Sequence, residues 1–231
     1  MGAALAMWPV YSGAMVAKSK GRTAPHIDVS LLNETFVQQL VSGPVCDAVA
    51  SDTTLPSLQE ARGQFVRIYQ CLLRSVTLSD PKARRMHMQD VRIENSDLAN
   101  IDLTGSSLER VEIISTRLTG ATCTEAQLKS VLFQECKMDL ALLRMARLQQ
   151  CVFECCNLTD ADFYGADLTG VVFRGCDLSR ADISYAKLSG ADLRDCRLDG
   201  VRGMPASMEG LIINPDQAAL LITLFGVRVV W

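Results

Sequence analysis

An apolar residue recurs at every fifth position from residue 93 to residue 198, and this period restricts the fold of the chain more than any other feature. A small residue, mostly Ala, Cys or Val, stands two positions before nearly every later member, while polar residues and Gly fill most other positions. The apolar series runs Ile93, Leu98, Leu103, Leu108, Ile113, Leu118, Cys123, Leu128, Phe133, Met138, Leu143, Leu148, Phe153, Leu158, Phe163, Leu168, Phe173, Leu178, Ile183, Leu188, Leu193 and Leu198. None of these residues is charged, so the period marks one continuous core.

Neither a helix nor a flat strand gives a period of five. A helix turns about 100° per residue, so a step of five residues leaves successive apolar side chains about 140° apart around the axis. In a strand the side chains alternate between two faces, so the same step flips the apolar residue to the opposite face. Both conflicts disappear if the chain bends once in every five residues, with the large apolar residue and the small one before it pointing inward.

A second period of 20 residues indicates that four such segments complete one coil. Phe133, Phe153 and Phe173 are spaced by 20 residues, and so are the cysteines of the small inward position, Cys136, Cys156, Cys176 and Cys196. Like residues would then stack on like residues in adjacent coils. Adjacent strands of a sheet lie about 4.8 Å apart.

These residues resemble the pentapeptide-repeat family, whose consensus is A-(D/N)-L-x-x. The segments ADFYG, ADLTG, ADISY and ADLRD, all within residues 161–195, follow that consensus. The resemblance covers about residues 66–200, and Pro81 falls where the pattern breaks. It implies a right-handed quadrilateral β-solenoid, or pentapeptide-repeat β-helix. The residues on either side of the repeats add a C-terminal capping helix and a partly helical N-terminal segment to this all-β fold.

The pattern divides the chain into four regions, namely a flexible leader (1–28), a helical or irregular segment (29–65), the solenoid (66–202) and a C-terminal cap (203–231). No Lys or Arg precedes the apolar residues 1–17, so the positive region of a signal peptide is missing. No apolar run is long enough for a membrane span. Leu32, Phe36 and Leu40 would share one face of a helix.

The cap contains a predicted helix over residues 215–225. Asn214 suits the N-cap, Pro215 the first helical position and Gln217 the capping box, while Gly226 suits the stop. The helix is apolar nearly all round, so we expect it to be buried twice, against the solenoid and against a second copy. The dimer contacts would come from Leu220, Leu221, Leu224 and Phe225.

Known catalytic and cofactor motifs are missing from the sequence. It has no dinucleotide or phosphate loop, no zinc-protease motif and no nucleophile elbow. The sequence contains two histidines. His87 occupies an outward position of the repeat, so we expect it to be an ordinary surface residue. We expect Cys136, Cys156, Cys176 and Cys196, which we call the cysteine column, to be reduced thiols that only fill the core. We therefore expect a cytoplasmic protein that is not an enzyme and holds no cofactor or metal, and its net charge of −3 argues against direct nucleic-acid binding.

Function must then reside on the outer faces. Most faces mix both signs of charge, and only Asp162, Asp167 and Asp182 form a locally acidic corner. A fourth face carries an apolar row of Leu132, Val152 and Val172. Either the segment with Leu32, Phe36 and Leu40 covers that row, which we favour, or an external protein does.

The function predicted from these features is a rigid solenoid that binds another protein. The alternative follows from the resemblance, because some members of the family mimic the acidic outline of DNA, bind a type II topoisomerase such as gyrase and protect it from quinolones. Mixed charges along each face weaken that alternative, since a DNA mimic needs a continuous negative stripe.

Overall fold

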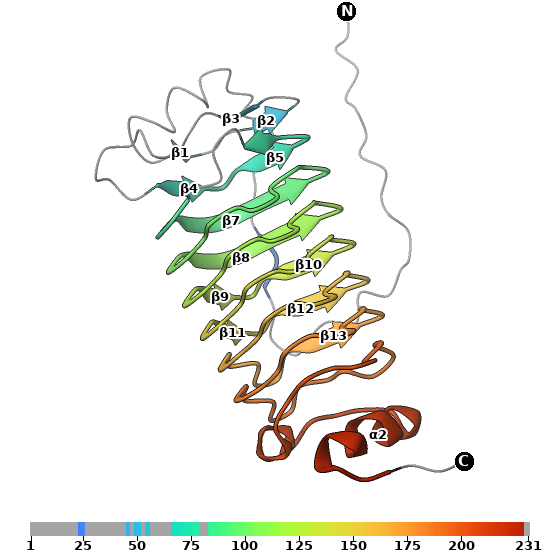
Figure 1. The fold of residues 1–231 in the computed structure, drawn as a ribbon. Helices are drawn as coiled ribbons and strands as arrows, with labels where there is room; N and C mark the ends of the chain where they lie inside the picture. Colours follow the sequence, from blue (N-terminus) through green and yellow to red (C-terminus); the bar gives the residue numbers. More distant parts are fainter. Residues whose placement is uncertain are drawn as a thin grey trace, which may run out of the picture.

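A computed structural model describes residues 23–25, 45–46, 49–51, 54–55, 66–78 and 83–228 of the chain. Its short strands are stacked coil upon coil into a rod that ends in a helix (Figure 1). The elements are β1 (Val45–Cys46), β2 (Val49–Ser51), β3 (Thr54–Leu55), β4 (Arg67–Tyr69), β5 (Leu72–Arg74), β6 (Thr77–Leu78), β7 (His87–Glu94), β8 (Ser107–Ile114), β9 (Gln127–Lys129), β10 (Leu132–Gln134), β11 (Arg147–Gln149), β12 (Val152–Glu154), β13 (Val172–Arg174), η2 (Pro205–Met208), α2 (Pro215–Leu221) and η3 (Ile222–Phe225).

Parallel pairing with a register of 20 residues holds the coils together. Phe133 of β10 pairs with Ile113 of β8 on one side and with Phe153 of β12 on the other. The same offset continues through single bridges between short segments as far as Asp192 and Ile212. The predicted all-β solenoid with a C-terminal helix is therefore confirmed, while its right-handed sense stays a prediction.

A left-handed backbone corner every five residues produces the bend that the sequence requires. From residue 85 to residue 200, every residue whose number is a multiple of five has a φ between 47° and 70°. Many corners close with a turn hydrogen bond, as where the Ala121 N–H donates to the Leu118 carbonyl at 2.9 Å. A positive φ at the third residue of such a turn is the mark of a type II turn.

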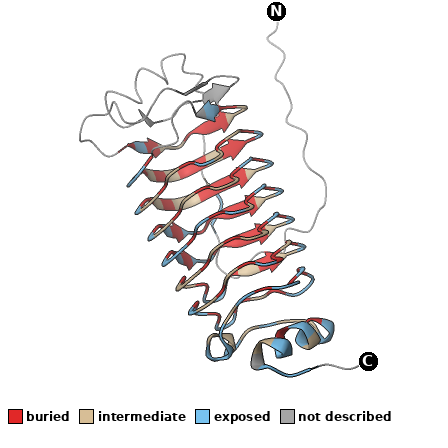
Figure 2. Cartoon of the chain, in the orientation of Figure 1, coloured by how far each residue is buried: buried red, intermediate tan, exposed pale blue. Residues whose placement is uncertain are grey.

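The interior is filled by the two inward positions of each repeat. The large apolar residues from Ile93 to Leu198 and the small residues before them are buried, and red bands run through every coil in Figure 2. Phe153 stacks between Phe133 and Phe173 with ring centroids 4.8 Å apart on both sides. Phe163 meets Phe153 edge to face at 6.5 Å. This stack confirms the predicted 20-residue column of aromatic residues.

The residue between the two inward residues of each repeat points outward, so each coil has four such outward residues. Outward residues 20 positions apart stack into four rows along the solenoid, and each row defines one numbered face. Face 1 carries Asp97, Arg117, Lys137, Asn157, Asp177 and Arg197; face 2 carries Asp102, Thr122, Leu142, Asp162, Asp182 and Arg202; face 3 carries Arg67, His87, Ser107, Gln127, Arg147, Asp167 and Lys187; face 4 carries Leu72, Arg92, Glu112, Leu132, Val152, Val172, Asp192 and Ile212.

The structure adds strands upstream of residue 66, inside the region expected to be helical or irregular. Val45 of β1 pairs with Ile68, Ala50 of β2 with Leu73 and Leu55 of β3 with Leu78. These pairs are offset by 23 residues instead of 20. Three extra residues in the connection to β4 thus shift the pentad phase, which hides this coil from a search at fixed period.

The C-terminal cap differs in one respect from the predicted helix over residues 215–225. The α-helix α2 ends at Leu221 and the tighter 3₁₀-helix η3 continues to Phe225. The start follows the prediction, because the Asn214 N–H donates to Oε1 of Gln217 at 2.7 Å, and Gly226 ends the helix with a φ of 74°. Gln217 also donates to the carbonyls of Leu193 and Cys196, which ties the cap to the last coil. No helix within the described ranges is both long and apolar enough to cross a bilayer.

The aromatic stack yields a stability prediction. Phe153→Ala should lower the free energy of unfolding by about 3–5 kcal/mol, because the cavity leaves Phe133 and Phe173 without a partner. Urea denaturation followed by circular dichroism measures the loss. Phe153→Leu, which keeps an apolar side chain in the site, is the control and should lose clearly less. Equal losses for both variants would contradict the role of the stack.

Candidate interaction surface

Aspartates of the outward rows first serve the backbone of their own coil. Oδ1 of Asp162 accepts the Tyr164 N–H at 2.8 Å, Oδ1 of Asp182 accepts the Ser184 N–H at 2.9 Å, and Asn157 does the same for Thr159 at 3.0 Å. Each bond satisfies the N–H two residues further on, at the entrance to the left-handed corner. The repeated Asp or Asn is thus explained by the turn, without any ligand.

Ion pairs between residues 20 positions apart then balance the charge of neighbouring coils. Arg117 reaches Asp97 at 3.0 Å, and Arg180 reaches Asp160 at 2.7 Å. The register of the coils brings such partners together without any loop. The mixed signs along faces 1, 2 and 4 are therefore largely internal pairs, and the outward field of these faces is weak.

The predicted acidic corner is compensated in the same way. Asp162 pairs with Arg144 at 3.1 Å, Asp167 with Lys187 at 3.5 Å and Asp182 with Arg202 at 3.9 Å. Burial raises the pKa of Asp167, but hydrogen bonds from the Thr169 hydroxyl and N–H outweigh it and hold the pKa below its ordinary value. Each carboxylate is engaged with a cation, so the three do not form a free negative stripe.

The predicted apolar row on face 4 offers little free surface. Leu132 is 4% exposed and Val152 2% exposed, although both point outward by register, and Val172 is half-buried. The segment expected to cover this row, with Leu32, Phe36 and Leu40, lies outside the described residues. Leu132 and Val152 are thus not exposed for contact with an external protein.

An apolar surface that the sequence analysis did not identify lies on face 2 and its corners. It consists of Leu140, Leu142, Met145 and Tyr185, which are 38–59% exposed, together with the half-buried Tyr164, and we call it the apolar corner. The rings of Tyr164 and Tyr185 are 5.1 Å apart, and the Arg144 guanidinium lies 4.8 Å from the centre of the Tyr164 ring.

Three members of the apolar corner occupy left-handed positions. Leu140, Met145 and Tyr185 have φ of 59°, 54° and 59°. At the other corners of residues 70–78 and 85–200 the positive-φ residues are Gly, polar or charged, or Cys155. A bulky side chain in this conformation costs about 1–2 kcal/mol compared with Gly. These three residues are therefore unfavourable both for the backbone and for solvation, and neither fold stability nor solubility explains them.

The cap helix presents one apolar face to the solenoid and another to solvent. Leu221 is buried and Leu224 packs partly against the core, whereas Leu220 is 44% and Ile222 41% exposed. The side chain of Phe225 lies outside the description. We expected the helix to be buried on all sides. Within the chain it is buried only on the side that packs against the last coil, and its opposite side is exposed.

The cysteine column lies in the core, as the small inward position requires. Cys136, Cys156, Cys176 and Cys196 are buried free thiols, and Cys136 and Cys156 donate to the carbonyls of Ile113 and Phe133 at 3.3 and 3.4 Å. The adjacent thiols of Cys136 and Cys176, and then burial, raise the pKa of Cys156. Within the described residues, no cluster of His, Cys, Asp or Glu has the arrangement of a metal site.

Stacked five-residue segments, an inward Ala/Leu pair and an Asp or Asn turn define the class of this protein, a solenoid built from five-residue repeats. Family models for the "Pentapeptide repeat region" match residues 106–183 and 146–215, and the "Pentapeptide repeats (8 copies)" model matches residues 87–122. The chain belongs to the pentapeptide-repeat family. A comparison with curated proteins gave no match.

Several solved structures resemble the chain at low identity. HetL from the cyanobacterium Nostoc, a protein involved in the regulation of heterocyst differentiation, is 17% identical, with 74% of this chain and 92% of that one covered and a TM-score of 0.36. The plasmid-mediated fluoroquinolone resistance protein QnrB1 is 16% identical, with 80% and 100% covered and a TM-score of 0.35. Rfr23 from the cyanobacterium Cyanothece is 15% identical, with 74% and 88% covered and a TM-score of 0.24.

The turn role of the outward aspartates can be tested at Asp177. Its Oδ1 accepts the Ser179 N–H at 2.9 Å and the Ser179 hydroxyl at 2.5 Å. Burial raises its pKa, but these bonds outweigh burial and hold the pKa below the ordinary value. Asp177→Ala should therefore lose about 1 kcal/mol at neutral pH, whereas Asp177→Asn keeps the acceptor and should lose less.

The sign of the pH dependence follows from that lowered pKa. The ionised Asp177 stabilises the fold above the ordinary pKa of about 4, and this contribution disappears as the pH falls through the lower pKa of the folded state. The stability difference between wild type and Asp177→Asn should thus shrink from pH 7 to pH 3 in thermal unfolding. A difference that grows toward low pH would contradict this account.

Proposed function

We propose that this protein is a non-enzymatic, cytoplasmic solenoid that binds another protein through the apolar corner. The observation that carries the proposal is the exposure of Leu140, Met145 and Tyr185 at left-handed corners, where Gly or Asn would cost less. Side chains that lower stability and solubility together are typical of binding sites, where function opposes stability. The buried free thiols fit a reducing compartment.

The chemistry of the apolar corner suggests what the partner presents. Leu, Met and Tyr side chains supply apolar contact area, and aromatic residues and Met are enriched in protein interfaces. Arg144, which both pairs with Asp162 and lies over Tyr164, adds a charged rim. A partner with an apolar ridge flanked by polar groups would match this surface. The stacked coils below hold these side chains at fixed spacing, so binding requires little ordering of the backbone.

Substitution by Asn separates binding from folding. The triple variant Leu140→Asn, Met145→Asn and Tyr185→Asn should unfold at the same or a higher temperature than wild type, because Asn tolerates the left-handed conformation. The same variant should lose the partner by at least about tenfold, since exposed apolar anchors carry most interface energy. Affinity purification with crosslinking from the producing cells, quantified by mass spectrometry, measures the capture.

A matched control uses two polar corners outside the apolar surface. Glu125→Asn and Gln150→Asn make the same kind of backbone change at φ of 57° and 56°, and should leave capture unchanged. Capture that survives the triple variant would contradict the proposed surface. A supercoiling assay with a quinolone tests the DNA-mimic alternative: strong protection of a type II topoisomerase, lost when Asp162, Asp167 and Asp182 become Asn, would replace the present proposal.

We also propose that the protein forms a homodimer through the outer face of the cap helix, where Leu220 and Ile222 are exposed. An isologous contact of this kind would bury both side chains at once. Leu220→Lys combined with Ile222→Lys should convert a dimer into a monomer in light scattering, with no loss of thermal stability. Glu209→Lys, which lies outside the helix, is the control. A monomeric wild type at high concentration would contradict the dimer.

A further inference from the structure

We propose that the N-terminal end of face 3 holds a binding site for a phosphoryl group. A surface cavity of about 460 Å³ opens there, lined by Arg67, Tyr69, Arg85, Met86, His87, Gly105 and Ser107. The site lies on coils far along the chain from the apolar corner, and it does not depend on the function proposed for that corner.

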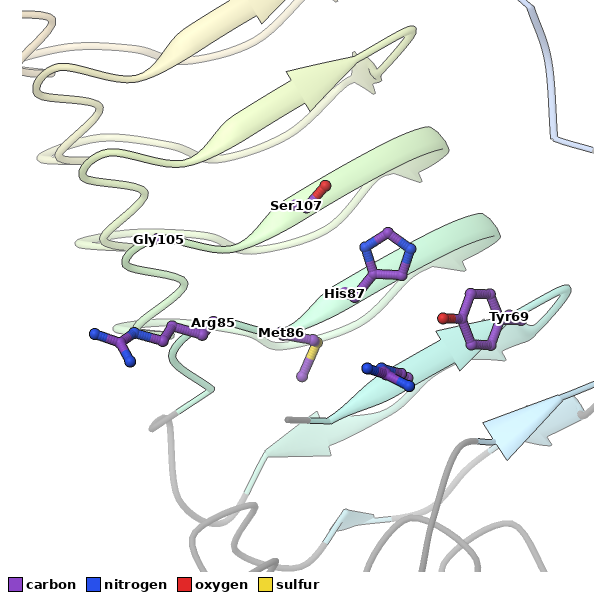
Figure 3. Close-up of a pocket in the computed structure, with 7 residues that line it drawn as sticks. Tyr69, Arg85, Met86, His87, Gly105 and Ser107 are labelled. Atoms are coloured by element: carbon purple, nitrogen blue, oxygen red, sulfur yellow. The ribbon is translucent and has the colours of Figure 1, made fainter. Parts of the chain in front are cut away.

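The register of three coils brings the polar side chains of the cavity together. Arg67 of β4 pairs with His87 of β7, which pairs with Ser107 of β8, so these residues form one outward row. The Tyr69 and His87 rings lie 5.5 Å apart. Figure 3 shows the Tyr69 hydroxyl turned toward the space beside the His87 ring, whereas the Arg85 guanidinium extends away from that space on the other side of Met86. Arg67 also lines the cavity.

The arginines of this cavity differ from those of the other faces. Within the described part of residues 66–202, all arginines except three are paired with a carboxylate, and the exceptions are Arg67, Arg85 and Arg147. All three border face 3, whose outward row has no carboxylate from Arg67 to Arg147. In a chain with a net charge of −3, the cavity thus has two arginines, Arg67 and Arg85, that are not paired with a carboxylate.

The donor set matches a phosphoryl group better than a carboxylate. The Arg67 guanidinium can donate two parallel hydrogen bonds to phosphoryl oxygens, the Tyr69 hydroxyl, the His87 ring and the Ser107 hydroxyl can add single donors, and Arg85 adds positive charge at the edge of the cavity. No carboxylate stands in the row of Arg67, His87 and Ser107, and Glu109 in the neighbouring row of the same strands is already paired with Arg110 and Lys129. The phosphoryl group could belong to a phosphorylated protein segment or to a free small molecule, and both present the same oxygens.

Titration of the full-length protein distinguishes these sources. Inorganic pyrophosphate, a phosphoserine peptide and its unphosphorylated form are titrated by isothermal calorimetry at fixed ionic strength. At least one phosphorylated probe should bind, and the unphosphorylated peptide should not. Tighter binding of the peptide would identify a protein segment as the source, and tighter binding of pyrophosphate a small molecule. Failure of both phosphorylated probes would overturn the proposal.

Three variants test whether binding occurs in this cavity. Arg67→Gln should weaken binding about tenfold, which corresponds to the loss of one charge-assisted contact. Ser107→Asp places a carboxylate in the same row and should abolish binding by repulsion. Arg147→Gln removes another unpaired arginine of the row, four coils from Arg67 and outside the cavity, and should leave the affinity within twofold of wild type. Equal losses for Arg67→Gln and Arg147→Gln would overturn the site in favour of unspecific attraction, and thermal unfolding verifies that each variant is folded.

Discussion

The left-handed corner at every fifth residue is the constraint on which the rest of this molecule depends. It turns the chain by a fixed amount, so that from β4 onward residue n of one coil lies against residue n + 20 of the next, and parallel hydrogen bonds join successive coils. Most of these corners are not Gly, and each non-Gly residue carries a cost of about 1–2 kcal/mol. The fold tolerates that cost because the corners allow two of every five side chains to be fully buried and the backbone to be paired on both sides.

The same register decides the electrostatics of the surface. An acid and a base that are 20 residues apart meet across adjacent coils, as Asp97 and Arg117 do, without any long connection. The Asp of the repeat consensus is needed by the turn whatever the partner is, since its Oδ1 accepts the N–H two residues on. An acidic composition in such a solenoid is therefore weak support for DNA mimicry. What decides is whether the second carboxylate oxygen is free, and on face 2 it is paired with Arg144 and Arg202.

The periodic part of the structure could be predicted from the sequence because each inward position repeats a physical requirement. Phe153 and Cys156 lie in the core where the five-residue phase places them. The strands at residues 45–55 could not be found in this way, since three additional residues before β4 shift their phase. The sequence also could not predict which side chains of an outward row are exposed to solvent. Leu132 and Leu142 occupy the same place in the repeat, yet one is buried and the other 38% exposed, and the five-residue pattern does not distinguish them.

Both candidate surfaces were found where single residues differ from the usual pattern of the repeat. The apolar corner has apolar side chains at left-handed corners, and the cavity on face 3 has arginines that are not paired with a carboxylate. They are separated along the rod, since the cavity lies on coils with residues 67–107 and the apolar corner on coils with residues 140–185. In a solenoid each coil contacts only its neighbours, so a local change at one surface has no direct packing route to the other. The two surfaces should then bind independently, and any coupling between them would have to come from a partner that contacts both. A rigid rod with two such surfaces would serve to hold a phosphorylated group and an apolar protein segment at a fixed separation.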